Sequence, residues 1–547
     1  PIGGEAYISL EAGEFGWRRA LIGGGYGTAE HGARGDLNLT TTDGWRERTA
    51  YDRKSGSLRW DASVGDNAGL KTILGFSNID QQTGANSPLI RSDFKNNPTL
   101  NYLPIAFRKV DALRLSTNYE HQFGNSLLSL TPYFRDNSMD LLASFRLRFD
   151  PTVSESENKS YGLMAKWRTN FSPLRAKLIG GIDIDVSPGS RKEFRLNVVT
   201  SGSAASRQFL SSTRGTQIYD YDVEFRGMSP YIHGEISPTT RLRITAGLRY
   251  DQLRYQLANR NRGAVAVSAG TSSVFYGQAA DTTKTFQRAS PKLGATFAIT
   301  AQHHLYGSLN YGFRAPSEGD LFRPSNGSSA AAAQVSAQAA SELKPIKARQ
   351  LELGVRGQFG PMNYDAVLYD LQKRDDILSF TDRSLPGSPS RSTNAGATQH
   401  RGLELGLGAK LGEHFRIDGA YSYSKQIYKD WIVPGAGDFS GKEIEAAPRV
   451  MANTRLTWRP IATLRTQLEW ARIGSYWLDQ SNTEKYEGHD LFNLRANFSI
   501  GKNVEIFGSI INMTDKRFAD SAQLQGATPV YSPGLPRTFY AGVEFKL

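Results

Sequence analysis

The sequence contains no cysteine among its 547 residues. Disulfide bonds, thiolate metal sites and cysteine nucleophiles are therefore excluded. Long hydrophobic runs are also missing, because 39% of the residues are hydrophobic, the mean hydropathy is −0.44, and no stretch approaches the roughly 18 consecutive apolar residues that a membrane-spanning helix needs. This excludes helical membrane proteins. It does not exclude β-barrels, whose strands turn half of their side chains into a polar lumen.

Motifs for catalysis and for metal binding are lacking as well. The eight His residues are scattered, and His303 and His304 are adjacent rather than at the i, i+4 spacing of a helical zinc site. Residues 23–25 are three glycines without the strand–turn–helix context of a phosphate loop. No nucleophile with a His partner stands out. We therefore expect neither an enzyme nor a resident metal or covalent cofactor.

The chain is basic, with 65 Lys and Arg residues against 53 Asp and Glu residues and a net charge of +12. Nucleic acid is not expected as a partner, since no basic helix, zinc finger or aromatic RNA-binding motif accompanies this charge. The charges are instead dispersed along the chain. They indicate capture of an anionic ligand or contact with lipopolysaccharide phosphates, or they balance an acidic segment outside this chain.

Hydrophobic residues recur at every second position from one end of the chain to the other. In residues 113–119, for example, Leu113 and Leu115 alternate with Arg114 and Ser116. Such alternation predicts strands, and we count about 22 of them. They begin near Glu5, Trp17, Gly35, Tyr51, Leu70, Val110, Ser126, Lys159, Leu174, Tyr221, Arg241, Phe286, His303, Ile346, Asn363, Gln399, His414, Arg449, Ala462, His489, Asn503 and Arg537.

The connections between these segments alternate in length. Tight turns join segments 4–5, 6–7 and so on to 20–21, whereas the long connections all fall at the opposite parity. Short turns at one end and long loops at the other are typical of outer-membrane barrels. The pattern predicts an all-β transmembrane antiparallel β-barrel with short periplasmic turns, long extracellular loops and both termini on the short-turn side. The long connections cover residues 83–109, 187–219, 257–284, 316–345 and 514–536.

The final segment supports a barrel. Phe539, Ala541, Val543, Phe545 and Leu547 occupy alternate positions up to the last residue. This resembles the C-terminal signal by which bacterial outer-membrane barrels are recognised for assembly, although the usual last residue is aromatic and here it is Leu. We therefore expect a multi-pass protein of the bacterial outer membrane.

Several motifs resemble the β-barrel of TonB-dependent outer-membrane receptors, and they cover essentially the whole chain in the family's order. Each motif alone is weak, whereas the ordered set is specific. They are TDGWR (42–46), RITAGLRYD (243–251), ASPKLG (289–294), LYGSLNYGFRAPS (305–317), LKP (343–345), LELG (351–354), RGLE (401–404) and INMTDKRF (511–518).

The resemblance implies a plug inside the barrel, and the chain departs from the family here because it contains no plug. Residues 1–4 are similar to the end of a plug or its linker, and residues 5–547 are assigned to the receptor barrel. The family's mechanism implies that ligand binds the loops and the plug, and that the TonB–ExbB–ExbD complex acts through the plug. Outer-membrane lipids, including lipopolysaccharide, are the other expected partners.

The resemblance implies uptake of a scarce nutrient, and we expect a ferric siderophore complex as the ligand. A vitamin or cofactor, haem, an oligosaccharide, or a passive porin-like channel remain alternatives. Ligand must meet the inward face near the extracellular mouth, where Arg suits anionic chelates and Tyr suits aromatic groups; the alternative for each such residue is an ion pair within the lumen. The candidates on strand ends are Tyr133, Arg135, Arg249, Asp251, Arg314 and Arg374, with weaker candidates in loops at Arg91, Lys95, Tyr102 and Phe322.

Overall fold

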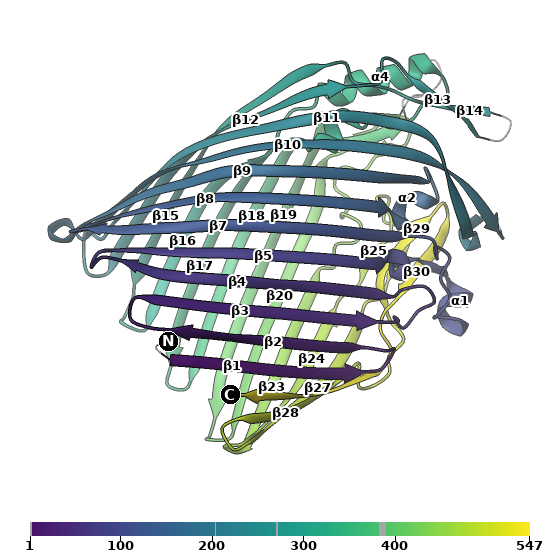
Figure 1. Ribbon diagram of the computed structural model, residues 1–547. Helices are drawn as coiled ribbons and strands as arrows, with labels where there is room; N and C mark the ends of the chain where they lie inside the picture. The colour runs from purple at the N-terminus through teal and green to yellow at the C-terminus, as the bar shows by residue number, and fades with distance from the viewer. Residues whose placement is uncertain (1–2, 203, 270–271, 382–389) are drawn as a thin grey trace.

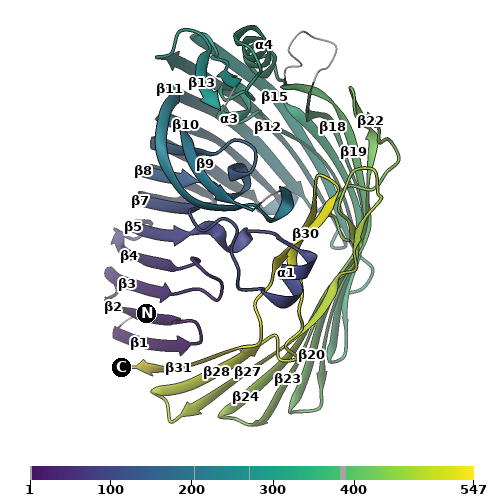
Figure 2. The ribbon, with the colours of Figure 1, turned by 90° about the vertical axis from the view of Figure 1, so that its right-hand side faces the viewer.

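The chain forms a closed antiparallel barrel in the computed structural model, which describes residues 3–202, 204–269, 272–381 and 390–547 (Figures 1 and 2). Consecutive strands pair with each other, and β1 closes the ring by pairing with β31. Residues 1 and 2 of the expected plug linker lie outside the described residues. The 22 strands of the barrel are β1 (Gly3–Gly13), β2 (Arg18–Gly27), β3 (His31–Thr42), β4 (Tyr51–Val64), β5 (Ala68–Gln82), β7 (Phe107–Phe123), β8 (Ser126–Leu142), β9 (Thr152–Phe171), β10 (Ala176–Ser201), β11 (Gln208–Ile236), β12 (Leu242–Asn259), β15 (Thr282–Ala298), β16 (His303–Arg314), β17 (Ile346–Phe359), β18 (Met362–Thr381), β19 (Ser390–Leu411), β20 (Phe415–Asp430), β23 (Val450–Ile461), β24 (Leu464–Ile473), β27 (His489–Ile500), β28 (Val504–Ile511) and β31 (Thr538–Lys546).

The number and order of the strands confirm the prediction, since each expected segment corresponds to one barrel strand. The segregation of the connections is confirmed too: the tight turns lie at one end with both termini, and the α-helices lie at the other (Figure 1). Gly124 and Gly412 have φ values of 54° and 68° in two of the tight turns, a left-handed conformation that glycine adopts without steric cost.

One expected connection is wrong. Residues 187–219 are mostly strand, because β10 and β11 continue as a long hairpin with pairing up to Ser201 and Gln208. The upper part of this hairpin carries polar side chains on its outward face, such as Lys192 and Asp222. A strand with water on both sides loses the alternation of apolar and polar residues, so the pattern in the sequence ended before the strand did.

The barrel wall has an apolar outside and a polar inside. Large exposed apolar side chains such as Leu58, Leu293, Leu351 and Leu368 form the outer band. Inward side chains instead bond to one another, as Asn118 does with Ser129 and Thr131. No helix among the described residues is long and apolar enough to cross a membrane.

The buried apolar clusters lie among the connections at the long-loop end. One joins β11 to the connections 260–281 and 315–345 through Tyr219, Tyr276 and Phe322. Another joins the connections 83–106 and 143–151 to the long hairpin. A three-stranded sheet, β6–β30–β29, and helix α1 lie within the ring of strands when the barrel is viewed from this end (Figure 2). The elements outside the barrel sheet are η1 (Thr83–Asn86), β6 (Leu89–Ile90), α1 (Arg91–Asn96), α2 (Ser144–Leu147), η2 (Ser172–Leu174), η3 (Ala204–Ser206), β13 (Val265–Ala269), β14 (Ser272–Tyr276), α3 (Glu318–Phe322), α4 (Ala330–Ser341), β21 (Ile432–Val433), β22 (Gly437–Asp438), β25 (Tyr476–Trp477), β26 (Lys485–Tyr486), β29 (Ala519–Gln525) and β30 (Thr528–Pro533).

Candidate ligand-binding mouth of the barrel

Tyr133 and Arg135 lie on the inward face of β8, as predicted. The Tyr133 hydroxyl donates a hydrogen bond to the Asp185 carboxylate on β10, which also accepts one from Ser187. The Arg135 guanidinium carbon lies 4.5 Å from the centre of the Tyr133 ring. The ring therefore holds an exposed cation in place without neutralising it, because a cation–π contact supplies no counter-charge.

Arg114, on the neighbouring strand β7, completes this basic patch and was missed as a candidate. It pairs directly with Arg135 in the β7–β8 register and lines an inward hollow of about 440 Å³ with Asp36, Asn38 and Arg53. Its inward orientation follows from its alternation with Leu113 and Leu115. Two cations that face each other across neighbouring strands repel, and an anion placed between them would relieve that repulsion.

Arg249 and Asp251 lie inward on β12, but they neutralise each other. The Arg249 Nε–Asp251 Oδ1 distance is 2.8 Å, and Arg249 Nη1 lies 2.6 Å from Asp183 Oδ2 on β10. Asp251 is buried. The structure thus places this pair in an ion-pair network within the lumen, which was the alternative for each candidate.

Arg314 lies at the upper end of β16, at an inward position, since Ser308 and Tyr306 on the same face bond to the inward side chains Glu352 and Asp365. It is exposed and pairs in register with Ile346. Over the described part of the chain, Arg114, Arg135 and Arg314 form no ion pair. They are inward cations that remain available to a ligand at this end.

Arg374 faces the other way, and its predicted inward position is wrong. It is directly opposite Lys347 of β17, on the face that carries the lipid-exposed Leu351 and Leu368. A bulge follows immediately, with Asp375 at a φ of 59° and a shift in register before Asp376. Asp370 and Gln372 precede Arg374 on this outward face. The alternation of apolar and polar residues therefore ends before Arg374, and the sequence pattern did not reveal its orientation.

Two weaker candidates are structural. Tyr102 and Phe322 have almost no exposed surface, so they pack in the loop clusters and do not meet ligand. Burial, aided by the hydrogen bond to Asp93, raises the pKa of the Tyr102 phenol well above its usual value, so it stays protonated and donates to that carboxylate. Arg91 donates to the Tyr531 hydroxyl at 2.8 Å, and Lys95 is exposed on α1.

Together these side chains provide cations and hydroxyl groups around an open lumen. Guanidinium groups bind carboxylate, catecholate or phosphate oxygens through charge-assisted hydrogen bonds. In the described ranges, no group of three or more His, Cys, Asp and Glu residues is arranged to hold a metal ion. The geometry suits a bulky anionic ligand.

Comparison with known proteins gives a consistent result. The family model for the TonB-dependent receptor-like β-barrel matches residues 51–513. The probable TonB-dependent siderophore receptor PiuA of Acinetobacter baumannii is 21% identical over 315 residues, which are 55% of this chain and 38% of that protein. The vitamin B12 transporter BtuB of Photobacterium profundum is 22% identical over 259 residues, 47% of this chain and 37% of that protein. The chain thus spans less than two fifths of the length of these relatives in the matched regions.

Solved structures share the fold. The crystal structure of the siderophore receptor PiuA from Acinetobacter baumannii matches with a TM-score of 0.80 at 15% identity, over 100% of this chain and 82% of that chain. The unliganded ferric citrate transporter FecA matches with a TM-score of 0.78 at 16% identity, over 100% of this chain and 79% of that chain. At these identities, the likeness establishes the architecture of the barrel.

Proposed function

Because the chain belongs to the TonB-dependent receptor-like β-barrel family, we propose that it forms the outer-membrane barrel of a receptor that takes up a ferric siderophore. The observation that carries the proposal is the inward patch of Arg114, Arg135 and Tyr133 below the extracellular loops, with Arg314 inward at the end of β16. The patch matches the negative charge of a ferric chelate. The iron arrives as cargo within its chelate.

We further propose that residues 1–4 connect the barrel, residues 5–547, to a plug, through which the TonB–ExbB–ExbD complex drives transport. The wide 22-stranded ring supports this, because a barrel of that size leaves a lumen that side chains alone do not fill. The family consists of transport receptors, and the proposal accordingly includes no chemical reaction.

Vitamin B12 uptake is the second candidate, and the likeness to BtuB favours it specifically. The two candidate ligands differ in how strongly their binding should depend on the basic patch. A ferric chelate with net negative charge depends on Arg114 and Arg135, whereas the corrin ring of a cobalamin depends mainly on apolar and neutral polar contacts.

The test is equilibrium binding of ferric catecholate, ferric hydroxamate, ferric citrate, cobalamin and haem to the full-length receptor. Arg135→Ala and Arg314→Ala are measured beside Arg374→Ala, a matched control that removes an outward guanidinium at the same end of the barrel. We expect one ferric chelate to bind, and its Kd to rise about tenfold or more in either inward variant but not in the control. Binding of cobalamin or haem alone, or equal effects in all three variants, would overturn the siderophore proposal. Ion flux without saturable binding would indicate a passive channel.

A further inference from the structure

A short sheet links two connections that leave the ring of strands on opposite sides of the junction between β31 and β1. β29 and β30 belong to the connection between β28 and β31, whereas β6 belongs to the connection between β5 and β7. Val530 pairs with Ile90, and Tyr531 pairs with Leu89. Viewed from the extracellular end, this sheet lies inside the ring (Figure 2). We call residues 519–533 the strap and the junction of β1 with β31 the seam. The strap therefore reaches from one side of the seam to the other.

The seam is the one junction in the described chain whose two barrel strands are not joined by a turn or a loop. Its pairing covers residues 7–13 of β1, whereas the pairing of β4 with β5 covers residues 51–64. At the other junctions, the connection between the two strands limits how far they can separate. At the seam, hydrogen bonds and side-chain contacts alone oppose separation. Local opening of a protein starts where the fewest interactions must break, so the seam is the junction most in need of reinforcement.

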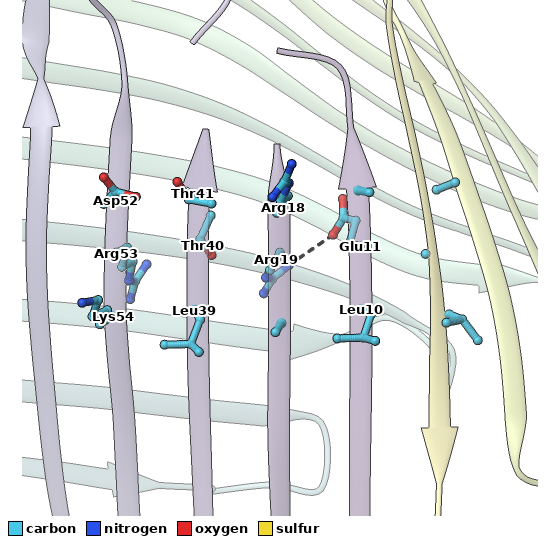
Figure 3. Close-up of a pocket in the computed structure, with 15 residues that line it drawn as sticks. Leu10, Glu11, Arg18, Arg19, Leu39, Thr40, Thr41, Asp52, Arg53 and Lys54 are labelled. Atoms are coloured by element: carbon cyan, nitrogen blue, oxygen red, sulfur yellow. Dashed lines mark ion pairs between the residues drawn. The ribbon is translucent and has the colours of Figure 1, made fainter. Parts of the chain in front are cut away.

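The extracellular half of β1 is held more firmly to β2 than to β31. Glu11 points toward Arg19 of β2, with 3.9 Å between Arg19 Nη1 and Glu11 Oε2 (Figure 3). Across the seam, Glu11 pairs with Gly542 and Ala12 pairs with Ala541, so neither pair brings two large side chains together. Cross-strand side-chain pairs stabilise a sheet, and these two pairs add little of that stabilisation.

The strap is anchored firmly on the far side of the seam, at β6 and α1. Leu89 and Val530, one from each partner, have no exposed surface. Arg91 donates a hydrogen bond to the Tyr531 hydroxyl at 2.8 Å, and the centre of the Phe94 ring lies 5.1 Å from that of Tyr531. Buried apolar area and packed aromatic rings both oppose separation of the strap from this connection.

On the near side of the seam, the strap is fixed to the connection between β24 and β27. The Tyr476 hydroxyl accepts a hydrogen bond from the Ala522 amide at 2.9 Å, and the Tyr486 hydroxyl accepts one from the Ala519 amide at 3.0 Å. These four residues belong to a buried apolar cluster against which Phe94 of the β5–β7 connection packs. Among the clusters formed by the described residues, this one alone joins connections from both sides of the seam.

We propose that the strap is a lock that holds the extracellular end of the seam closed. The strap leaves the barrel at Ile511 and returns to it at Thr538. Separation of β1 from β31 carries these two residues away from β6, so it must break the contacts of the strap as well as the hydrogen bonds of the seam. A pull on residues 1–4 would act on β1 and hence on the seam. That last consequence rests on the proposed plug, whereas the lock itself does not.

The experiment measures opening of the seam by hydrogen exchange and mass spectrometry of the full-length receptor in detergent. Exchange at residues 7–13 reports on the seam, and exchange at residues 528–533 reports on the strap. The pairing of β15 with β16 at residues 292–298 is the internal reference, because it is as long as the seam but is closed by a turn. No ligand is needed, so the result is independent of the binding test of the proposed function.

Val530→Ala/Tyr531→Ala removes the buried contacts of the strap with β6 and α1. Ile218→Ala/Tyr219→Ala is the matched control, since it truncates an equally buried aliphatic and tyrosine pair in another loop cluster. We expect exchange to rise about tenfold or more at the seam in the strap variant and to stay unchanged at the internal reference. The control should leave exchange at the seam unchanged.

A disulfide bond between the strap and β6 tests the lock in the opposite direction. Ile90→Cys/Val530→Cys places two thiols at paired positions in a chain that otherwise contains no cysteine. Oxidation should slow exchange at the seam about tenfold or more relative to the reduced protein. Faster exchange in the strap without a change at the seam, equal acceleration at the reference or in the control, or no difference between the oxidised and reduced proteins would overturn the proposal. Heat-modified gel migration confirms that each variant forms the barrel.

Discussion

Arginine residues at the extracellular end of the barrel occur in two different settings. On the inner wall, Arg114 and Arg135 are exposed and face each other without a carboxylate between them. In the loop layer, Arg323 at the end of α3 forms a two-pronged ion pair with Glu193 of β10, whose side chain is completely buried. Arg191 lies 3.2 Å from the same carboxylate. The same side chain thus stays exposed without a carboxylate partner in one setting and packs between loops in the other, and burial with a fixed partner distinguishes the two.

Breaking the buried pair should give the largest effect. Arg323→Ala leaves the Glu193 carboxylate buried without its main partner, and removing one member of a buried pair costs about 3–5 kcal/mol. We expect the loss to appear as local opening of residues 315–345, measured as faster hydrogen exchange and proteolysis there, while the barrel stays formed. The double replacement Glu193→Met/Arg323→Met should recover much of the protection. Unchanged exchange in Arg323→Ala would show that the pair does not hold the loop layer together.

Removing Arg114 or Arg135, the two exposed arginines of the inner wall, should affect ligand binding and leave stability unchanged. Arg114→Ala and Arg135→Ala are each expected to raise the Kd for a ferric chelate about 10- to 100-fold, with no change in thermal unfolding. If one anion bridges both side chains, the Kd of the double variant rises by less than the product of the two factors measured for the single variants. Fully multiplicative losses would contradict a shared contact.

Arg249 is intermediate between the buried Arg323 and the exposed Arg114 and Arg135, because it is paired but only partly buried. Its ion pairs with Asp183 and Asp251 are inside the barrel but partly open to water, so Arg249→Ala should cost at most about 1 kcal/mol in thermal unfolding. Ligand affinity should stay the same because the guanidinium is already occupied. A large loss of affinity in this variant would show that Arg249 contributes to ligand binding.

The smallest effect is expected for Arg374. It is exposed on the outward face opposite Lys347, and Arg374→Ala should change ligand affinity by no more than about twofold. Titration of the ferric chelate that binds the unaltered receptor is the measurement. A loss as large as that in Arg135→Ala would show that the outward face takes part in capture.

The architecture could be predicted from the sequence because each strand has lipid on one side and water on the other. Apolar and polar residues therefore alternate along it with a period of two. The segments around Leu113 and Leu248 show this, and their number and turn parity agree with the structure. Above the membrane this physical cause disappears, and the extension of β10 and β11 was therefore missed.

The individual site residues were less accessible. Tyr133, Arg135 and Arg314 were placed on the correct face. The face of Arg374 was misjudged because the outward residues Asp370 and Gln372 before it are polar. Tyr102 and Phe322 were taken for loop residues open to ligand, but long-range packing between different loops buries them. The sequence pattern showed that Arg114 points inward. Only its pairing with Arg135 in the structure showed that the two side chains form one basic patch.

The pairing of β1 with β31 has a consequence for how the molecule is assembled. Tyr7 lies opposite Lys546, so the edge of β1 that faces away from β2 must wait for β31 before its backbone groups find partners. Until then the sheet has two open edges, which cannot be left in hydrocarbon and which invite pairing with other chains. Closure of the ring is thus the final step of folding. A chain that stops before residue 538 should remain an unfinished sheet that depends on the assembly machinery to keep it from aggregating.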